Sequence, residues 1–212
     1  MPDGSNVLDT DSEALVGPNA ILQLKNPMDV LLGHGVLAQV LDLCRVTMPS
    51  GDRMISQSEV GRVHHMLWQL FPDRAEAVSV AAGQGTARYI RANRIPRIAR
   101  IALRLAPRAW AEKRLMHAIE DHAWTFCGSG ALGAHIEDGD LHFLIRDNPL
   151  ADPRAHPPHL CHWHAAVFAE LFTRVVGRPY TCREISCCAM GADVCHFVVS
   201  RAGGTSMTGG KV

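Results

Sequence analysis

The chain has 212 residues, of which 47% are hydrophobic, and equal numbers of acidic and basic side chains give it a formal net charge of zero. This length supports one sizeable core, and the neutral balance gives no sign of a nucleic-acid partner. The amino terminus lacks a basic segment followed by an apolar run, and no apolar stretch reaches the roughly 18–20 residues that span a bilayer. Seven cysteines without a secretory signal are typical of reduced thiols or metal ligands. We therefore expect a cytoplasmic protein of one domain without a transmembrane segment.

The two ends of the chain differ in composition from the part between them. Residues 1–20 are polar and acidic, and no basic residue precedes Lys25. From Ala202 onwards the chain is rich in Gly, Ser and Thr and cannot bury enough surface to become ordered. We predict a flexible arm over residues 1–27, a single domain over residues 28–201 and a disordered tail over residues 202–212.

The first half of the domain is predicted to be helical. Apolar residues recur there at helical spacing, and Ser58 is placed to cap one helix that ends before Pro72. Gly83 and Gly85 weaken the next helix locally. The predicted helices cover residues 30–43, 58–71, 75–92, the short segment between Pro96 and Pro107, and residues 108–126.

At Gly128 the hydrophobic period changes from helical to alternating. Two alternating runs, residues 132–136 and 141–145, flank Asp138-Gly139, a pair typical of tight hairpin turns. A Pro-rich loop then leads to a helix predicted over residues 159–176, and strands are predicted over residues 180–188 and 195–200. This order predicts an α+β fold with an N-terminal helical layer followed by an antiparallel sheet of two hairpins with a helix between them.

A candidate metal site lies near the end of the domain. Cys187 and Cys195 border a glycine-containing loop between the last two strands, and Cys161 opens the preceding helix. Glu184 stands three residues before Cys187, so both can bind one ion only where the strand bulges or ends between them. Three thiolates and a carboxylate can form a closed shell for zinc, which would then be a structural ion.

Two alternatives to this interpretation remain open. Free cysteines are often buried as small apolar residues, and no C-x-x-C pair anchors the pattern. His162 and His164, which follow Cys161, compete with Glu184 as the fourth ligand. The remaining cysteines are interpreted as packing or surface thiols, namely Cys44, Cys127, Cys182 and Cys188.

The sequence resembles the 4-vinyl reductase domain family over about residues 28–200. The cysteine that opens the penultimate helix contributes to the likeness, as do Gly83-Gln84-Gly85 and the segment 123–130. In length the chain is similar to a family member of bacteriochlorophyll biosynthesis in photosynthetic bacteria. The main signature consists of Glu184, Cys187, Ala189, Gly191, Cys195 and Phe197.

The resemblance implies a fold related to haem-based nitric-oxide sensors and to Golgi transport-particle subunits. Phenol-sensing transcription activators of similar fold bind zinc through three cysteines and a glutamate, which correspond here to Cys161, Glu184, Cys187 and Cys195. The resemblance also implies a homodimer, for which the segments 30–43 and 60–71 offer apolar surface. A location in the cytoplasm, at the periphery of the photosynthetic membrane, would suit a role in pigment synthesis.

The family name suggests an enzyme that reduces a vinyl group of a chlorophyll precursor. The sequence has no G-x-G-x-x-G after a predicted strand and no C-x-x-C-x-x-C run for an iron–sulfur cluster. We therefore favour an accessory protein that binds a tetrapyrrole intermediate, of the magnesium-porphyrin or protochlorophyllide type, and presents it to pathway enzymes. The alternatives are a vinyl reductase and a small-molecule sensor.

Basic residues that could anchor such a ligand are concentrated in one segment. Residues 88–114 contain nine basic side chains and one acid, Glu112. Arg97, Arg100 and Arg104 fall on one side of a helical wheel, and arginine binds carboxylates such as propionates bidentately. A solvated helix face or a partner-docking surface is the alternative interpretation. The apolar slot expected for the macrocycle is lined by Leu115, Ile119, Ala123, Leu132, Leu141 and Phe143.

Overall fold

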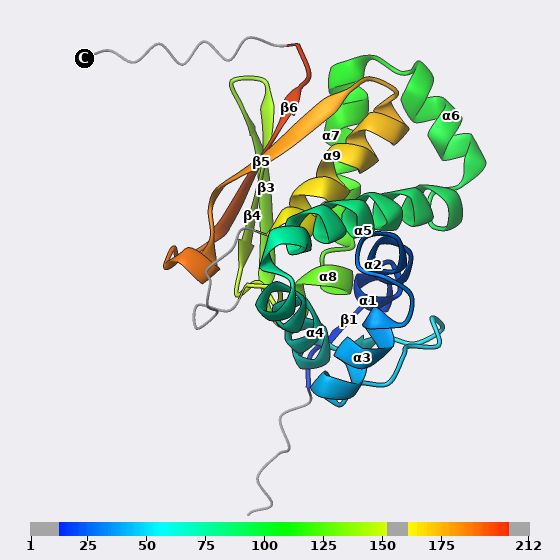
Figure 1. The fold of residues 1–212 in the computed structure, drawn as a ribbon. Coiled ribbons are helices and arrows are strands. Elements are labelled where there is room, and N and C mark those ends of the chain that lie inside the picture. The colour runs from blue at the N-terminus through cyan, green and yellow to red at the C-terminus, as the bar shows by residue number, and fades with distance from the viewer. Residues whose placement is uncertain (1–12, 152–160, 204–212) are drawn as a thin grey trace, which may run out of the picture.

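The computed structural model describes residues 13–151 and 161–203. A four-stranded antiparallel sheet forms one side of the molecule, and the helices cover one of its faces (Figure 1). α9 (His162–Val176) packs against the sheet, and α5 (Pro72–Asn93) packs closely along α9. The predicted α+β architecture, with a helical layer first and one helix between two hairpins, is confirmed.

The sheet has the strand order β3-β4-β6-β5. β3 (Ala131–Glu137) and β4 (Asp140–Arg146) are joined at Asp138-Gly139, where both residues have positive φ, as the predicted hairpin turn requires. β5 (Tyr180–Ser186) and β6 (Cys195–Arg201) form the second hairpin, and their register shifts between Glu184 and Ser186. The irregularity that the metal-site prediction required is therefore present in β5.

The helices depart from prediction mainly near the amino terminus. The segment expected as one helix over residues 30–43 forms α2 (Lys25–Leu31) and α3 (Val36–Cys44), because Gly33 and Gly35 have positive φ between them. α4 (Gln57–Leu70) is capped by Ser56 rather than Ser58, since the Ser56 Oγ accepts a hydrogen bond from the Glu59 amide. The remaining helices are α6 (Arg97–Leu105), α7 (Arg108–Asp121) and α8 (Trp124–Cys127), so that the helix predicted over residues 108–126 is interrupted.

The prediction of a flexible arm over residues 1–27 is wrong for residues 13–27. β1 (Leu15–Val16) pairs with β2 (Ile55–Ser56), and α1 (Asn19–Leu22) follows at once. Val16, Ile21 and Leu24 are buried in the core, where α4 and α5 lie against this segment. The domain therefore begins earlier than residue 28. The predicted tail over residues 202–212 lies outside the described residues from residue 204 onwards.

Gly83 sets the distance between α5 and α9. A Cβ atom at this position would lie 2.4 Å from the carbonyl oxygen of Trp163 and 2.8 Å from the Cβ of Ala166. The backbone of α9 can approach α5 this closely only because residue 83 has no side chain. The contact lies beside the first turn of α9 and so positions Cys161, which immediately precedes that helix.

Candidate metal centre

The structure brings Cys161, Glu184, Cys187 and Cys195 together at one end of the sheet. All four are buried, and one potential ligand atom of each lies within 4.8 Å of the others. The Sγ–Sγ distances are 3.7 Å for Cys161–Cys187, 3.9 Å for Cys161–Cys195 and 3.7 Å for Cys187–Cys195. Sulfurs bound to one tetrahedral zinc at about 2.3 Å would lie about 3.8 Å apart. The three thiols are therefore already spaced as such an ion requires.

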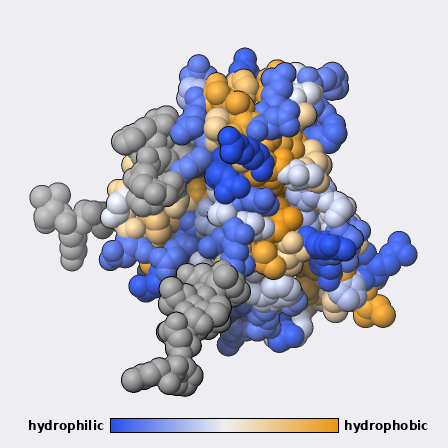
Figure 2. All heavy atoms as spheres, turned by 90° about the horizontal axis from the view of Figure 1, so that it is seen from below, coloured by the Kyte–Doolittle hydropathy of each residue, from blue (hydrophilic) through white to orange (hydrophobic). Residues whose placement is uncertain are grey.

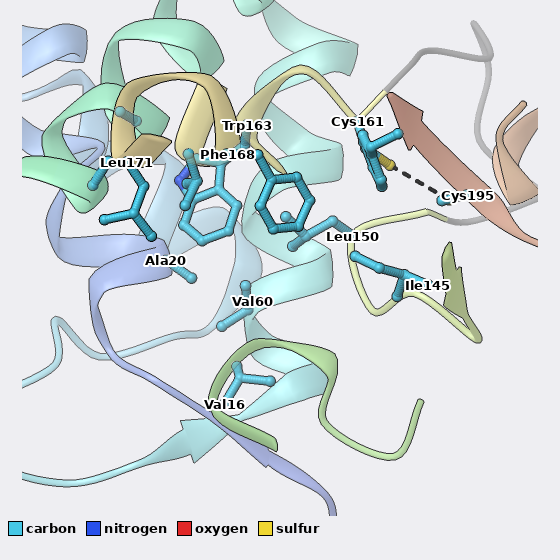
Figure 3. Packing of buried hydrophobic residues seen from close by; sticks show 14 of the residues in the cluster. Val16, Ala20, Val60, Ile145, Leu150, Cys161, Trp163, Phe168, Leu171 and Cys195 are labelled. Atoms are coloured by element: carbon cyan, nitrogen blue, oxygen red, sulfur yellow. Dashed lines mark hydrogen bonds between the residues drawn. The ribbon is translucent and has the colours of Figure 1, made fainter. Parts of the chain in front are cut away.

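Each ligand candidate is positioned by the irregular end of a regular element. Cys161 is the N-cap residue of α9, and its sulfur is directed towards Cys195 at the margin of the apolar packing around Trp163 and Phe168 (Figure 3). Cys187 lies just beyond the end of β5, where a short 3₁₀ turn (Cys188–Met190) follows. Gly191, with positive φ, ends this turn and allows the chain to return to Cys195 at the start of β6.

Backbone and side-chain donors surround the cluster. The Cys161 amide donates a hydrogen bond to Glu184 Oε2. The Cys188 amide donates to the Cys195 sulfur at 3.4 Å, and Asn148 Nδ2 donates to the Cys161 sulfur at 3.4 Å. Such donors orient ligands and stabilise thiolates in an outer shell. The buried Asn148 was missed by sequence reasoning, because a single asparagine in a loop carries no recognisable signal.

The electrostatics of the cluster favour a bound cation. Burial raises the pKa of the Glu184 carboxyl to about 7, although the Cys161 amide acts in the opposite direction. Hydrogen bonds from Cys161 and Cys195 lower the pKa of Cys187 to about 5. Glu184 Oε1 is buried and has no hydrogen-bond partner within the described residues. An orphaned carboxylate oxygen beside a thiolate is costly unless a cation neutralises it, so the donor set fits zinc.

The two histidines that competed with Glu184 lie elsewhere. His162 stacks on Trp68 with 5.7 Å between ring centroids, and its Nδ1 is 3.8 Å from Glu76 Oε1. His164 is buried among aromatic rings, and burial lowers the pKa of its imidazole to about 3, with His64 adding to the effect. Neither belongs to the thiol cluster, so the geometry favours Glu184 as the fourth ligand.

A second group of potential ligands, His135, Glu137 and His142, lies on the exposed face of the first hairpin. The imidazoles of His135 and His142 stack with 4.9 Å between centroids and an interplanar angle of 16°. Because ring-nitrogen lone pairs lie in the ring plane, those of stacked rings run side by side and do not converge. His142 Nδ1 also lies 2.9 Å from His196 Nε2. Stacking and hydrogen bonding therefore account for this group.

The four other cysteines do not join the metal cluster. Cys44 and Cys127 are buried, and burial raises the pKa of the Cys127 thiol to about 12. Cys182 and Cys188 are half-buried, and burial raises the pKa of Cys188 to about 11. A raised thiol pKa keeps these side chains protonated and unreactive, in agreement with the prediction of packing thiols.

The arginines predicted to bind a ligand do not act as one group. Arg100 Nη1 donates to the carbonyl oxygen of Arg91 at 3.1 Å, and Arg97 is exposed. Arg104 instead lies beside Gly177 at the end of α9. There it lines a hollow of about 340 Å³ between α5, α6 and α9. The other residues that line this hollow are Arg91, Thr173, Arg174, Gly177, Arg178 and Pro179.

The apolar slot predicted between the long helix and the first hairpin is filled by protein. Leu141 and Phe143 are core residues, and Phe143 stacks on Phe168 with 4.5 Å between ring centroids. Leu115 and Ile119 are buried as well. The prediction failed because α9, which comes later in the chain, covers the inner face of β4.

Comparison with known proteins gives two curated relatives of similar length. A bacteriochlorophyll synthase 23 kDa chain from Cereibacter sphaeroides is 38% identical over 183 residues, which cover 86% of this chain and 88% of the relative. Another, from Rhodobacter capsulatus, is 39% identical over 195 residues, covering 91% and 90%. The chain belongs to the bacteriochlorophyll synthase 23 kDa chain family.

The carboxy-terminal part of this family member also matches the 4-vinyl reductase domain, over residues 141–201, which include all four residues of the thiol–carboxylate cluster. The resemblance inferred from the sequence is thereby confirmed. Among solved structures, an H-NOX protein from S. oneidensis has a TM-score of 0.57 at 11% identity, covering 88% of this chain and 99% of that one. An oxygen-binding H-NOX domain related to soluble guanylate cyclases has a TM-score of 0.51 at 8% identity, covering 92% and 100%. At these identities the likeness concerns the fold alone.

Proposed function

We propose that the protein is an accessory factor of bacteriochlorophyll synthesis that binds a tetrapyrrole intermediate and presents it to a pathway enzyme. The observation that carries the proposal is the identity of 38–39%, over most of both chains, to proteins named for bacteriochlorophyll synthesis. The thiol–carboxylate cluster supports a binding role, because four protein ligands would close the shell of a zinc ion and leave no position for substrate. A zinc held there would organise the fold around the end of the sheet.

The arginine-lined hollow is the best candidate for the anionic part of the pigment. It draws cationic side chains from three segments, with Arg91 on α5, Arg104 on α6, and Arg174 and Arg178 at the end of α9. Arg174 is paired with Glu170 at 2.8 Å, whereas Arg104 and Arg178 have no ion-pair partner within the described residues. Two unpaired guanidinium groups at one hollow suit the two propionate carboxylates of a tetrapyrrole.

This assignment predicts a selective loss of pigment binding. Arg104→Gln combined with Arg178→Gln should weaken the binding of divinyl protochlorophyllide by about tenfold or more, because charge-assisted bidentate hydrogen bonds would be lost. Absorption titration of the purified full chain measures the effect. Arg94→Gln combined with Arg97→Gln is the matched control, since it removes the same charge from exposed positions that do not line the hollow.

Equal weakening by both double variants would refute the hollow as the binding site. Absence of any pigment binding by the unmodified protein would overturn the carrier function itself. Conversion of the divinyl pigment to its monovinyl product, by the isolated protein with a nicotinamide cofactor and abolished by a point mutation, would favour the reductase instead.

We also propose that the helical half of the molecule forms a homodimer. Val30 and Leu43 on α2 and α3 are 73% and 61% exposed, and Leu70 at the end of α4 is also exposed. Apolar side chains reach the surface among hydrophilic ones on the face viewed in Figure 2. Sedimentation should give about twice the 23.1 kDa chain mass, and Val30→Glu with Leu43→Glu should halve it. A single-chain mass across micromolar concentrations would contradict the dimer.

A further inference from the structure

The apolar face of α6 points towards solvent. Ile98, Ile101 and Leu105 recur at the spacing of one helix face and are 82%, 59% and 81% exposed. No residue of this nine-residue helix is buried. Figure 1 shows α6 at the outer edge of the molecule, away from the sheet. A surface helix normally turns such a stripe towards the core, so this arrangement indicates that something else covers it.

Contacts on the opposite side of α6 hold the helix in this orientation. Arg100 donates to the Arg91 carbonyl oxygen, and Arg104 lies against Gly177. Leu103 and Ala106 are partly buried against the core. Pro96 and Pro107 delimit the helix and fix its ends. The polar side of α6 is thus the attached side, and the helix cannot bury its three exposed apolar residues by rotating without losing these contacts.

The charge around this face is entirely positive. Residues 94–111 contain five arginines and no acidic residue. Arg94 and Arg97 are exposed, and on a helical wheel Arg97 borders the apolar stripe. Trp110, which is 51% exposed, follows on α7. An apolar stripe bordered by arginine and accompanied by an exposed tryptophan is the composition of helices that lie in the headgroup region of a membrane.

We propose that α6 docks this protein onto the surface of a bilayer that contains anionic lipids. Ile98, Ile101 and Leu105 would enter the boundary between headgroups and acyl chains, while Arg94 and Arg97 contact lipid phosphates. At about 1.5 Å per residue the helix is about 13 Å long, so it lies along the surface. Within the described residues no helix has the length and hydropathy to cross a bilayer. A second copy fits this face poorly, because pairing two α6 helices would bring arginines together without acids to neutralise them.

The test uses the full chain, without pigment, and vesicles made of equal parts phosphatidylcholine and phosphatidylglycerol. Co-sedimentation with these vesicles should exceed that with pure phosphatidylcholine by at least tenfold and should fall as salt is raised. Ile98→Gln with Leu105→Gln should reduce binding at least tenfold. Arg94→Gln with Arg97→Gln should weaken binding and reduce its dependence on salt. All these side chains are exposed, so thermal melting should stay unchanged and show that the variants fold.

Met48→Gln with Ile136→Gln is the control, because it removes two exposed apolar side chains far from α6 along the chain and should leave vesicle binding unchanged. Equal binding to neutral and anionic vesicles, or no binding to either, would overturn the proposal. It would also be overturned if Ile98→Gln with Leu105→Gln left vesicle binding intact. A lower sedimentation mass of that variant in the absence of lipid would make the face a protein interface instead. Since no pigment is present, a negative result leaves the proposed tetrapyrrole binding to be judged by its own titration.

Discussion

Cys187→Ser should abolish stoichiometric zinc binding and strongly destabilise the domain. Cys187 lies 3.7 Å from each of the other two sulfurs and is buried, so its replacement removes a ligand that no neighbouring side chain can supply. The free energy of binding a structural zinc is free energy of folding, because the unfolded chain has no formed site. We expect a loss of about 4 kcal/mol or more, which lowers the melting temperature by about 10 °C or more for a domain of this size.

Metal analysis and thermal melting of protein purified without chelator would measure both effects. Cys44→Ser is the matched control, because Cys44 is also a buried thiol but donates its hydrogen bond to the Arg62 carbonyl oxygen, far from the cluster along the chain. That variant should keep its zinc. If the unmodified protein carries well under one zinc per chain, the metal assignment fails and the three thiols are packing residues.

The local signals in the sequence predicted most of the sheet and the ligand cluster. Asp138-Gly139 specified the first hairpin because few residue pairs tolerate positive φ twice in succession. The geometric condition on Glu184 and Cys187, that the strand must be irregular between them, could be stated before the structure was known, and β5 meets it. The choice between Glu184 and the histidines could not be made from spacing, because it depends on how α9 lies against the sheet.

Features that depend on packing between distant segments were missed. Residues 13–27 contain few apolar side chains, and their burial follows from contacts with α4 and α5. The arginine-lined hollow combines Arg91, Arg104 and Arg178 from separate segments, and only Arg104 had been selected from its helical periodicity. The same periodicity identified the apolar stripe of α6, but periodicity alone cannot say that the stripe faces outwards.

Gly83→Ala should destabilise the protein although alanine is the better helix former. The added methyl group would lie 2.4 Å from the Trp163 carbonyl oxygen, and a backbone atom of a packed helix cannot move aside cheaply. Overpacking of this kind costs about 1–3 kcal/mol, occasionally more, which outweighs the gain of up to about 1 kcal/mol in helix propensity. Because the strained contact lies beside the first turn of α9, displacement of that turn should also shift Cys161 and weaken zinc binding.

Gly85→Ala provides the matched comparison, since it makes the same chemical change two residues further along α5. Its methyl group would meet the Gln23 side-chain oxygen at 2.8 Å, and this flexible tip can rotate away. We expect Gly85→Ala to be neutral or stabilising by up to about 1 kcal/mol, with zinc content unchanged. Urea unfolding and metal analysis of both variants would test the pair. Equal stability of the two would show that the separation of α5 and α9 does not depend on Gly83, and that the start of α9 is held by the thiol cluster alone.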